Sequence, residues 1–120
     1  MEDSRGTLSF IQDLEFSVER VFWIYNVPEG SERGEHAHRT CSEILFAING
    51  SCDVDLIYGD EMQTIHLCQP NEGVVIRQMV WCRLYNFSKD FIGLCLASQT
   101  YSPEGYVNSF EDFLDETSQN

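Results

Sequence analysis

The sequence predicts an all-β protein, an antiparallel sandwich or barrel of roughly seven or eight short strands that ends in one short helix. Apolar, β-branched and aromatic residues come in short runs, and turn residues separate these runs about every ten residues. The 120 residues leave room for one domain, which we place at 1–120. A hydrophobic fraction of 42% supplies enough material for one packed core.

Three runs define the first half of the chain. Residues 20–27 (RVFWIYNV) are rich in strand-forming residues, and a Pro-Glu-Gly-Ser turn ends them. Residues 43–49 (EILFAIN) and 52–58 (CDVDLIY) flank Asn49-Gly50, and such a pair between two strand-like runs predicts a β-hairpin. In the run CDVDLIY apolar and acidic residues alternate, which is the period of a half-buried strand.

The second half continues in the same way until the last residues. Turn residues at 59–61 and 70–73 bound one strand and precede three more, which gives expected strands at 62–68, 74–77, 80–86 and 91–98. Residues 109–115 instead have helical spacing, with Phe110, Phe113 and Leu114 on one face. We expect this helix to dock on the barrel.

Charge and composition exclude several classes of function. The net charge of −13, from 20 acidic and 7 basic residues, would repel a polyanion, so we expect no nucleic-acid partner. No apolar run is long enough to span a membrane, and no secretory signal is visible at the N-terminus. Five cysteines spread singly favour reduced thiols and a cytoplasmic protein. Arginine outnumbers lysine six to one, a bias that suits anion recognition, and we take Arg20 and Arg83 as candidate substrate-binding residues.

The segment 30–50, GSERGEHAHRTCSEILFAING, carries the chemistry. Residues two apart on a strand share a face, so His36 and His38 project into the same cavity. Glu43, on the next strand, can reach that cavity too. The string reads G-x5-H-x-H-x4-E-x6-G, which matches the first motif of the cupin superfamily of small β-barrels. The second cupin motif is degenerate, because Cys82 stands where a histidine is expected.

Within the cupins, the chain resembles the nucleotide-sugar 3,4-ketoisomerases that act on dTDP-4-keto-6-deoxyglucose. The likeness runs from about residue 5 to residue 113. It rests on Arg5-Gly6 with Leu8, on FSVERV at 16–21, on RGEHAH at 33–38 and on Gly50-Ser51-Cys52. It also rests on Val80-Trp81, LAS at 96–98 with Tyr101, Tyr106-Val107, and Phe110 to Phe113.

The resemblance implies a jelly-roll homodimer with a dTDP-sugar in the barrel and no obligatory metal or other cofactor. It also implies that His36 and His38 carry out the proton transfers. From the chemistry alone, isomerisation needs a base for the C3 proton, an acid, and a group that holds the oxyanion. We expect His38 to be the base and His36 the acid or enediolate partner, although the sequence does not decide between them. Arg33 is a candidate clamp for the diphosphate or the oxyanion. Trp23 either stacks on the thymine or sugar or packs in the core.

Three departures from the family pattern affect the expected site. Phe22-Trp23 replaces a pair of tyrosines, which removes any hydroxyl there. Arg39 and Glu43 stand where lysine and glutamine are usual, and a carboxylate at 43 would raise the pKa of nearby imidazoles or complete a metal site. Cys82 replaces a polar or basic residue. The stereochemistry at C4 of the product therefore stays open.

Two alternatives to this function remain at the level of sequence. In the first, His36, His38 and Glu43, with or without Cys82, ligate a transition metal, because two imidazoles and a carboxylate with open positions suit Fe(II), Mn(II) or Ni(II). In the second, the barrel binds a sugar nucleotide without catalysis. Metal analysis separates the first from the ketoisomerase, and exchange of solvent deuterium into the sugar separates the second.

Overall fold

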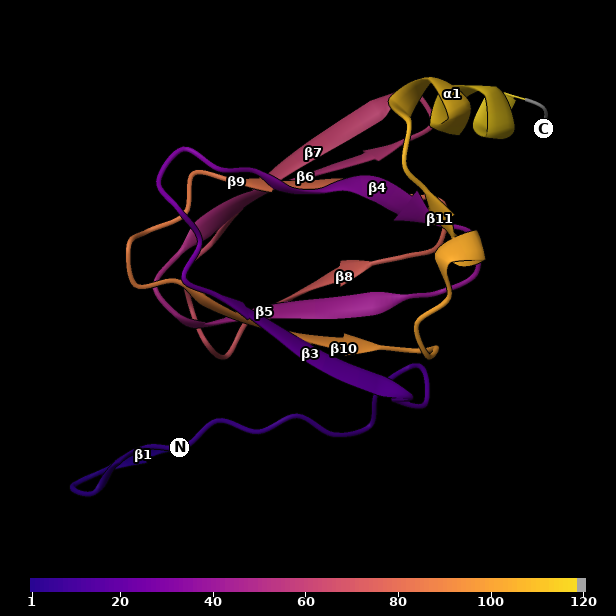
Figure 1. Ribbon diagram of the computed structural model, residues 1–120. Coiled ribbons are helices and arrows are strands. Elements are labelled where there is room, and N and C mark those ends of the chain that lie inside the picture. Colours follow the sequence, from indigo (N-terminus) through magenta and orange to yellow (C-terminus); the bar gives the residue numbers. More distant parts are fainter. Residues whose placement is uncertain (119–120) are drawn as a thin grey trace.

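Two antiparallel sheets face each other across the core (Figure 1), in a computed structural model that describes residues 1–118. One sheet has the order β3 (Arg20–Tyr25), β10 (Ile92–Ala97), β5 (Glu43–Asn49), β8 (Gly73–Ile76). The other has the order β11 (Tyr106–Val107), β4 (Arg33–His38), β9 (Trp81–Tyr85), β6 (Cys52–Tyr58), β7 (Glu61–Leu67). The predicted all-β jelly-roll architecture is confirmed.

Side chains alternate between the two faces of each sheet, and the inward ones form the core. Leu45 and Ala47 of β5 meet Val54 and Leu56 of β6 across the barrel, and all four are buried. The outward residues of the four-stranded sheet differ from those of an ordinary solvent face. Many of them are apolar and exposed.

The predicted hairpin at Asn49-Gly50 is wrong, because the strands on either side of it belong to opposite sheets. β5 pairs with β10 and β8, whereas β6 pairs with β7 and β9. The turn itself is present, with Gly50 at φ +70°, but it carries the chain from the four-stranded sheet to the five-stranded sheet. Its hydrogen bonds go to the loop between β9 and β10: Asn49 Nδ2 donates to the Asp90 carbonyl, and the Ser51 amide to Ser88 Oγ, at 2.9 Å each. The local hairpin lies instead between β6 and β7.

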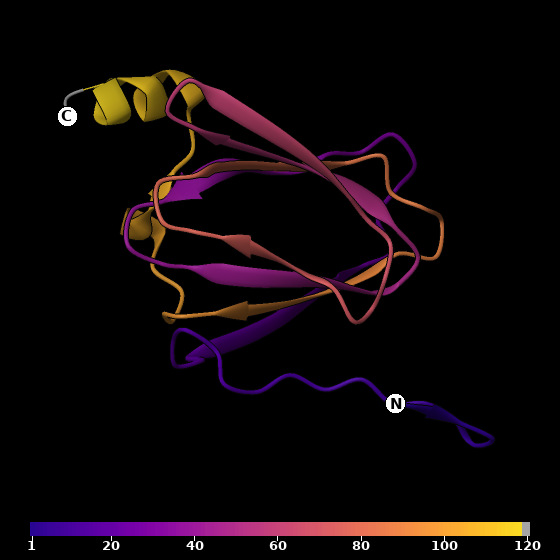
Figure 2. The same cartoon turned by 180° about the vertical axis from the view of Figure 1, so that it is seen from behind.

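The C-terminal segment covers one end of the five-stranded sheet. After the 3₁₀ turn η1 (Pro103–Gly105), β11 pairs with β4, and α1 (Phe110–Ser118) follows. The helix buries Phe113 completely against Trp81 and Val107 on the outer side of this sheet (Figure 2), which confirms the predicted docking. The sequence-based prediction did not include β11.

The N-terminal residues form an arm that extends from the barrel (Figure 1) and makes the molecule 55 Å long but 33 and 25 Å in its other extents. A small hairpin, β1 (Glu2–Asp3) with β2 (Gly6–Thr7), lies near its tip and was not predicted. No helix within residues 1–118 has the length and apolar character needed to cross a bilayer.

Candidate active site

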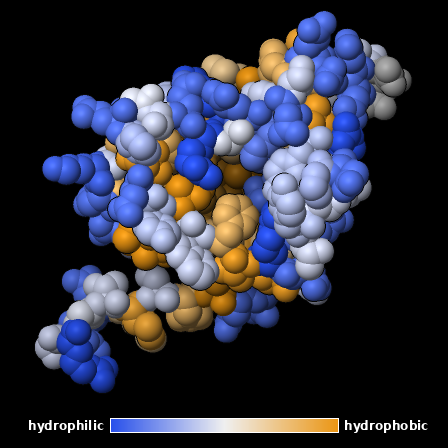
Figure 3. Space-filling view, in the orientation of Figure 1, coloured by the Kyte–Doolittle hydropathy of each residue, from blue (hydrophilic) through white to orange (hydrophobic). Residues whose placement is uncertain are grey.

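A pocket of about 170 Å³ lies between the two sheets, and both contribute to its walls. Figure 3, in the same orientation as Figure 1, shows a hollow in the face of the molecule toward the viewer, with apolar side chains inside and hydrophilic ones around the rim. Wider grooves occur on the outer surface, but this pocket is lined by His36 and Glu43 of the sequence motif, and His38 adjoins both. Its polar lining comprises Arg33, His36, Glu43, Cys82, Cys95 and Tyr106.

The two histidines are presented by an irregular stretch of β4. The register against β9 shifts between Gly34 and His36, and both Gly34 (φ +82°) and Glu35 (φ +54°) are left-handed. A Cβ at position 34 would lie 2.9 Å from the Cys82 carbonyl oxygen, so only glycine fits. Beyond this bulge, His36 and His38 project to the same side, with their ring centroids 4.8 Å apart. The predicted convergence of the imidazoles is confirmed.

His36 is held in one tautomer. Its Nδ1 lies 3.0 Å from the Gly34 carbonyl oxygen, which can only accept, so Nδ1 carries the proton and Nε2 keeps a free lone pair. Burial, and then the proximity of His38, hold the pKa of His36 below its ordinary value. His36 is therefore a neutral imidazole near pH 7.

His38 faces a buried carboxylate. Glu43 is the first residue of β5, where its side chain points inward like Leu45 and Ala47, and only 5% of it is exposed. Glu43 Oε1 lies 3.2 Å from His38 Nε2, and His38 is 3% exposed. A cationic His38 would thus be compensated by a negative charge in a site that excludes most water.

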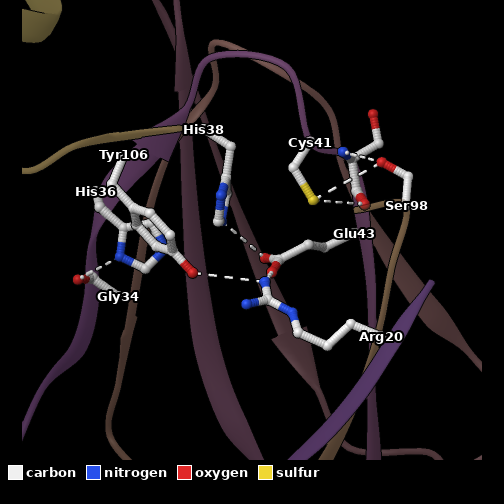
Figure 4. Close-up of polar contacts among 9 residues, drawn as sticks. Arg20, Gly34, His36, His38, Cys41, Glu43, Ser98 and Tyr106 are labelled. Carbon is white, nitrogen blue, oxygen red and sulfur yellow. Dashed lines mark hydrogen bonds and ion pairs between the residues drawn. The ribbon is translucent and has the colours of Figure 1, made fainter. Parts of the chain in front are cut away.

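Arg20 and Tyr106 complete the cluster (Figure 4). Arg20 Nη2, on β3, lies 3.5 Å from Glu43 Oε2 and 3.5 Å from the Tyr106 hydroxyl oxygen. The Tyr106 ring lies against both imidazoles, with its centroid 4.9 Å from that of His36 and 4.5 Å from that of His38. Four strands from two sheets therefore bring two imidazoles, a carboxylate, a guanidinium and a phenol together.

Comparisons with known proteins show the family. The family model for FdtA, described as WxcM-like, C-terminal, matches residues 1–118. The chain belongs to this family.

Three relatives of this FdtA-family chain show how closely it follows known members. It is 35% identical, over 92% of its own length and 82% of the relative's, to the TDP-4-oxo-6-deoxy-α-D-glucose-3,4-oxoisomerase of Aneurinibacillus thermoaerophilus. It superposes with a TM-score of 0.95 on QdtA, a sugar 3,4-ketoisomerase of Thermoanaerobacterium thermosaccharolyticum in complex with TDP. This match has 30% identity and covers 99% of this chain and 89% of that one. A variant of QdtA is in complex with TDP-4-keto-6-deoxyglucose. WlaRA of Campylobacter jejuni, a TDP-fucose-3,4-ketoisomerase, matches at a TM-score of 0.82 and 35% identity, over 85% of this chain and 76% of that one.

In this member of the FdtA family, two predicted site residues lie outside the pocket. Trp23 is 61% exposed on the outer face of β3, so it neither lines the pocket nor packs in the core of the chain. Arg83 lies on the outer face of β9, where it pairs with Glu32 and, at 3.2 Å, with Asp55. Both lie outside the pocket for the same reason. Side chains alternate between the two faces of a strand. Trp23 is three residues from the inward Arg20, and Arg83 is next to the inward Cys82, so both point outward.

Arg33 and Cys82 do line the pocket, as predicted. Arg33 is exposed at its edge, and no ion pair to it is found among residues 1–118. Cys82 is 5% exposed, and burial raises the pKa of its thiol to about 12, so it is not a thiolate nucleophile. All five cysteines are free.

The cluster fits a metal ion poorly. His36, His38 and Glu43 each offer one donor atom within 4.8 Å of the others, so the ligand types are present. However, the Arg20 guanidinium lies 3.5 Å from the same carboxylate, and a divalent cation there would face this fixed positive charge. In this FdtA-family chain the positive charge of Arg20 beside Glu43 thus disfavours a bound metal ion.

Tyr106 was not predicted as a site residue, although the resemblance includes the pair Tyr106-Val107. The sequence gives only a short indication of the strand that carries it, because just two strand-forming residues follow the Ser-Pro-Glu-Gly turn. Only their pairing with β4, which sets Tyr106 opposite His38 and Val107 opposite Ala37, brings the phenol into the pocket.

Proposed function

We propose that this protein is a sugar-nucleotide 3,4-ketoisomerase, which moves the keto group of a dTDP-4-keto-6-deoxyhexose from C4 to C3 in deoxysugar biosynthesis. The observation that carries the proposal is the His36–His38 pair inside the barrel, backed by the buried Glu43. The named activities of the relatives reported above support the same reaction.

The reaction starts at C3, whose proton is acidified by the adjacent C4 carbonyl. Removal of that proton gives an enediolate. Protonation at C4, with loss of the proton from the C3 hydroxyl and gain of one by the C4 oxygen, leaves the ketone at C3 and completes the isomerisation. We assign the base to His38, because its imidazolium would be balanced by Glu43 at 3.2 Å. His36 stays neutral, and its free Nε2 accepts a hydrogen bond from a sugar hydroxyl. Two adjacent imidazoles resist double protonation, so these separate roles fit the electrostatics.

The size of the pocket indicates which part of the substrate enters it. Pockets that enclose a drug-sized ligand usually measure roughly 300–1,000 Å³. The 170 Å³ here admits one ring-sized group, which we take to be the hexose. The diphosphate then stays at the edge, where Arg33 offers an exposed guanidinium on a protein of net charge −13. The same sugar-nucleotide substrate and the free thiols are in keeping with a cytoplasmic enzyme.

We further propose that the protein works as a homodimer, with the outer face of the four-stranded sheet in the interface. Val21, Trp23 and Tyr25 of β3 are exposed there, next to Ile48 and Ile92. The N-terminal arm adds Leu8, Phe10 and Ile11, also exposed, beside a groove of about 670 Å³ on this sheet. A patch of this kind marks a protein contact, and an isolated two-stranded hairpin such as β1–β2 is marginal without one. A second copy of the chain fits both observations.

The activity is tested by incubation with dTDP-4-keto-6-deoxyglucose in deuterated water and analysis by NMR. We expect a 3-keto product that carries deuterium at C4. His38→Ala should lose nearly all turnover, whereas His66→Ala should keep it, because His66 is 60% exposed and pairs with Asp53 on the outer surface. Full turnover by the His38→Ala protein would overturn the assigned role.

Two other results of the same assay would replace the proposal. Tight binding of the sugar nucleotide, with no deuterium at C3 or C4, would show a binding protein without catalysis. Activity that disappears on dialysis against a chelator and returns with one metal ion would show a metal-dependent cupin. We expect dialysis to leave turnover unchanged, since Arg20 competes with a cation at Glu43.

A further inference from the structure

The proposed reaction has not yet used the Tyr106 hydroxyl or the Arg20 guanidinium that bonds to it. The ring of Tyr106 lines the pocket and contacts both imidazoles. Its oxygen accepts a hydrogen bond from Arg20 Nη2 at 3.5 Å, so its own proton remains available for another acceptor. No acceptor for that proton is found among residues 1–118.

The position of Tyr106 is fixed by contacts that do not depend on a ligand. β11 pairs with β4 so that Tyr106 lies opposite His38 in the register. Arg39, the residue after His38, donates to the carbonyl oxygens of Glu104 (2.7 Å), within η1, and of Tyr106 (2.9 Å), directly after it. Its Nε and Nη2 pair with Glu116 of α1 at 3.1 and 3.0 Å. The docked helix therefore anchors the phenol over the histidines.

We infer that Tyr106 is a catalytic residue of the proposed isomerase, whose hydroxyl donates a hydrogen bond to the oxygen that becomes negative in the enediolate. The inference rests on the proposed function. His38 becomes a hydrogen-bond donor only after it has taken the C3 proton, and the Nδ1 proton of His36 is already bonded to the Gly34 carbonyl oxygen. Tyr106 supplies a donor, and the adjacent Arg20 guanidinium makes the phenol a stronger one. Phe22, at the pocket wall, has no hydroxyl to do this.

The geometry also suits a preorganised donor. The phenol oxygen is bonded to the Arg20 guanidinium and its ring packs against both imidazoles, so it needs little rearrangement when charge develops. Donors of this kind contribute more in the transition state than in the substrate complex, because the ground-state carbonyl carries only partial charge. Loss of the hydroxyl should consequently lower kcat and leave KM almost unchanged.

The test compares Tyr106→Phe with Tyr101→Phe in the full-length protein. Tyr101 lies in the same segment, and its ring is 5.7 Å from that of Tyr106, but it is 65% exposed. For Tyr106→Phe we expect kcat to fall by about 10²–10³, the usual effect of removing one such donor. Wash-in of deuterium at C3 should slow by the same factor. TDP binding, measured by calorimetry, should stay unchanged, which shows that the variant is folded. Tyr101→Phe should behave as the wild type.

The possible failures are distinguishable. If the wild-type protein neither forms product nor exchanges the C3 proton, the proposed function is wrong and this inference goes with it. If the wild type is active and Tyr106→Phe keeps full kcat, only the role of Tyr106 is overturned. A variant that raises KM and weakens TDP binding with kcat intact would show a binding role and would also contradict the inference.

Discussion

At the scale of single residues, the site depends on which imidazole takes a proton. His36 and His38 lie 4.8 Å apart, and only His38 has a carboxylate beside it. His36 is bonded through Nδ1 to a carbonyl oxygen, and burial opposes its charge. Burial and the proximity of His38 thus oppose a charge on His36, while a proton taken up by His38 has a carboxylate beside it.

We predict that His36 titrates below the ordinary pKa of about 6.5. The chain has three histidines, so NMR titration with single variants can assign each signal, and the exposed His66 serves as reference. His38→Asn should raise the pKa of His36, because the neighbouring positive charge is one cause of the depression. His66→Asn should leave it unchanged. An His36 pKa above 6.5 in the wild type would contradict the neutral role.

The same shift affects stability. A depressed pKa in the folded state means that the unfolded chain binds the His36 proton more readily. The contribution is absent above about pH 6.5 and destabilises the fold progressively as the pH falls from there through the lowered pKa. Urea titrations between pH 8 and 5 should therefore show stability falling over this interval, and less so for the His36→Gln protein.

The sequence defined the centre of the site but misplaced its periphery. His36, Glu43 and Arg33 line one pocket, with His38 beside the first two, because the motif fixes both their spacing and their strands. Trp23 and Arg83 were misassigned, although alternation along β3 and β9 would have excluded them: a strand cannot turn both Arg20 and Trp23 inward. Tyr106 was beyond reach, since its place depends on a two-residue strand that pairs across 68 positions of sequence.

At the scale of elements, the bulge in β4 decides where the histidines point. Gly34 and Gly30 have nearly the same left-handed φ, +82° and +81°. A Cβ at Gly30 would meet nothing within 4 Å, whereas one at Gly34 would press on the Cys82 backbone. A side chain at Gly30 would therefore meet only the conformational cost of the left-handed backbone. A side chain at Gly34 would meet that cost and a collision inside the site.

We predict that Gly34→Ala lowers the free energy of unfolding by more than Gly30→Ala does. The left-handed backbone alone costs roughly 1–2 kcal/mol at either position, and the collision adds to this at Gly34 only. Gly34→Ala should also lose activity, because the Gly34 carbonyl holds His36. Urea unfolding with unchanged m-values and the isomerase assay measure the two effects. Equal stability losses and equal activities would show that the bulge does not govern the site.

The failed hairpin shows what local signals do not contain. Asn49-Gly50 predicted a turn correctly, yet pairing is settled by where each strand buries its apolar face. β5 and β6 each carry inward apolar residues, Leu45 and Val54 among them. These side chains pack against each other across the core because the two strands lie in opposite sheets. The strand boundaries of both were nonetheless predicted to the residue, because alternation and turn residues are local.

At the scale of the whole molecule, the unusual feature is an apolar outer face on only one of the two sheets. Trp23 is 61% exposed on the four-stranded sheet, and Met62 is 64% exposed on β7 of the five-stranded sheet. Trp23 is surrounded by other exposed apolar residues and the N-terminal arm. The outer face of the other sheet carries the polar network of Asp55 with Arg83, Thr64 and Tyr85. If two copies associate, the sheet with Trp23 is the one they share.

We therefore predict a dimer in solution that Trp23→Glu weakens and Met62→Glu does not. A buried tryptophan at an interface commonly contributes about 2 kcal/mol or more, so the dissociation constant should rise at least about thirtyfold. Light scattering across a concentration series measures it. Removal of residues 1–12 should weaken the dimer too, because Leu8, Phe10 and Ile11 lie beside the same face. A wild-type protein that remains monomeric at every concentration would refute the interface, and greater damage from Met62→Glu would move it to the other sheet.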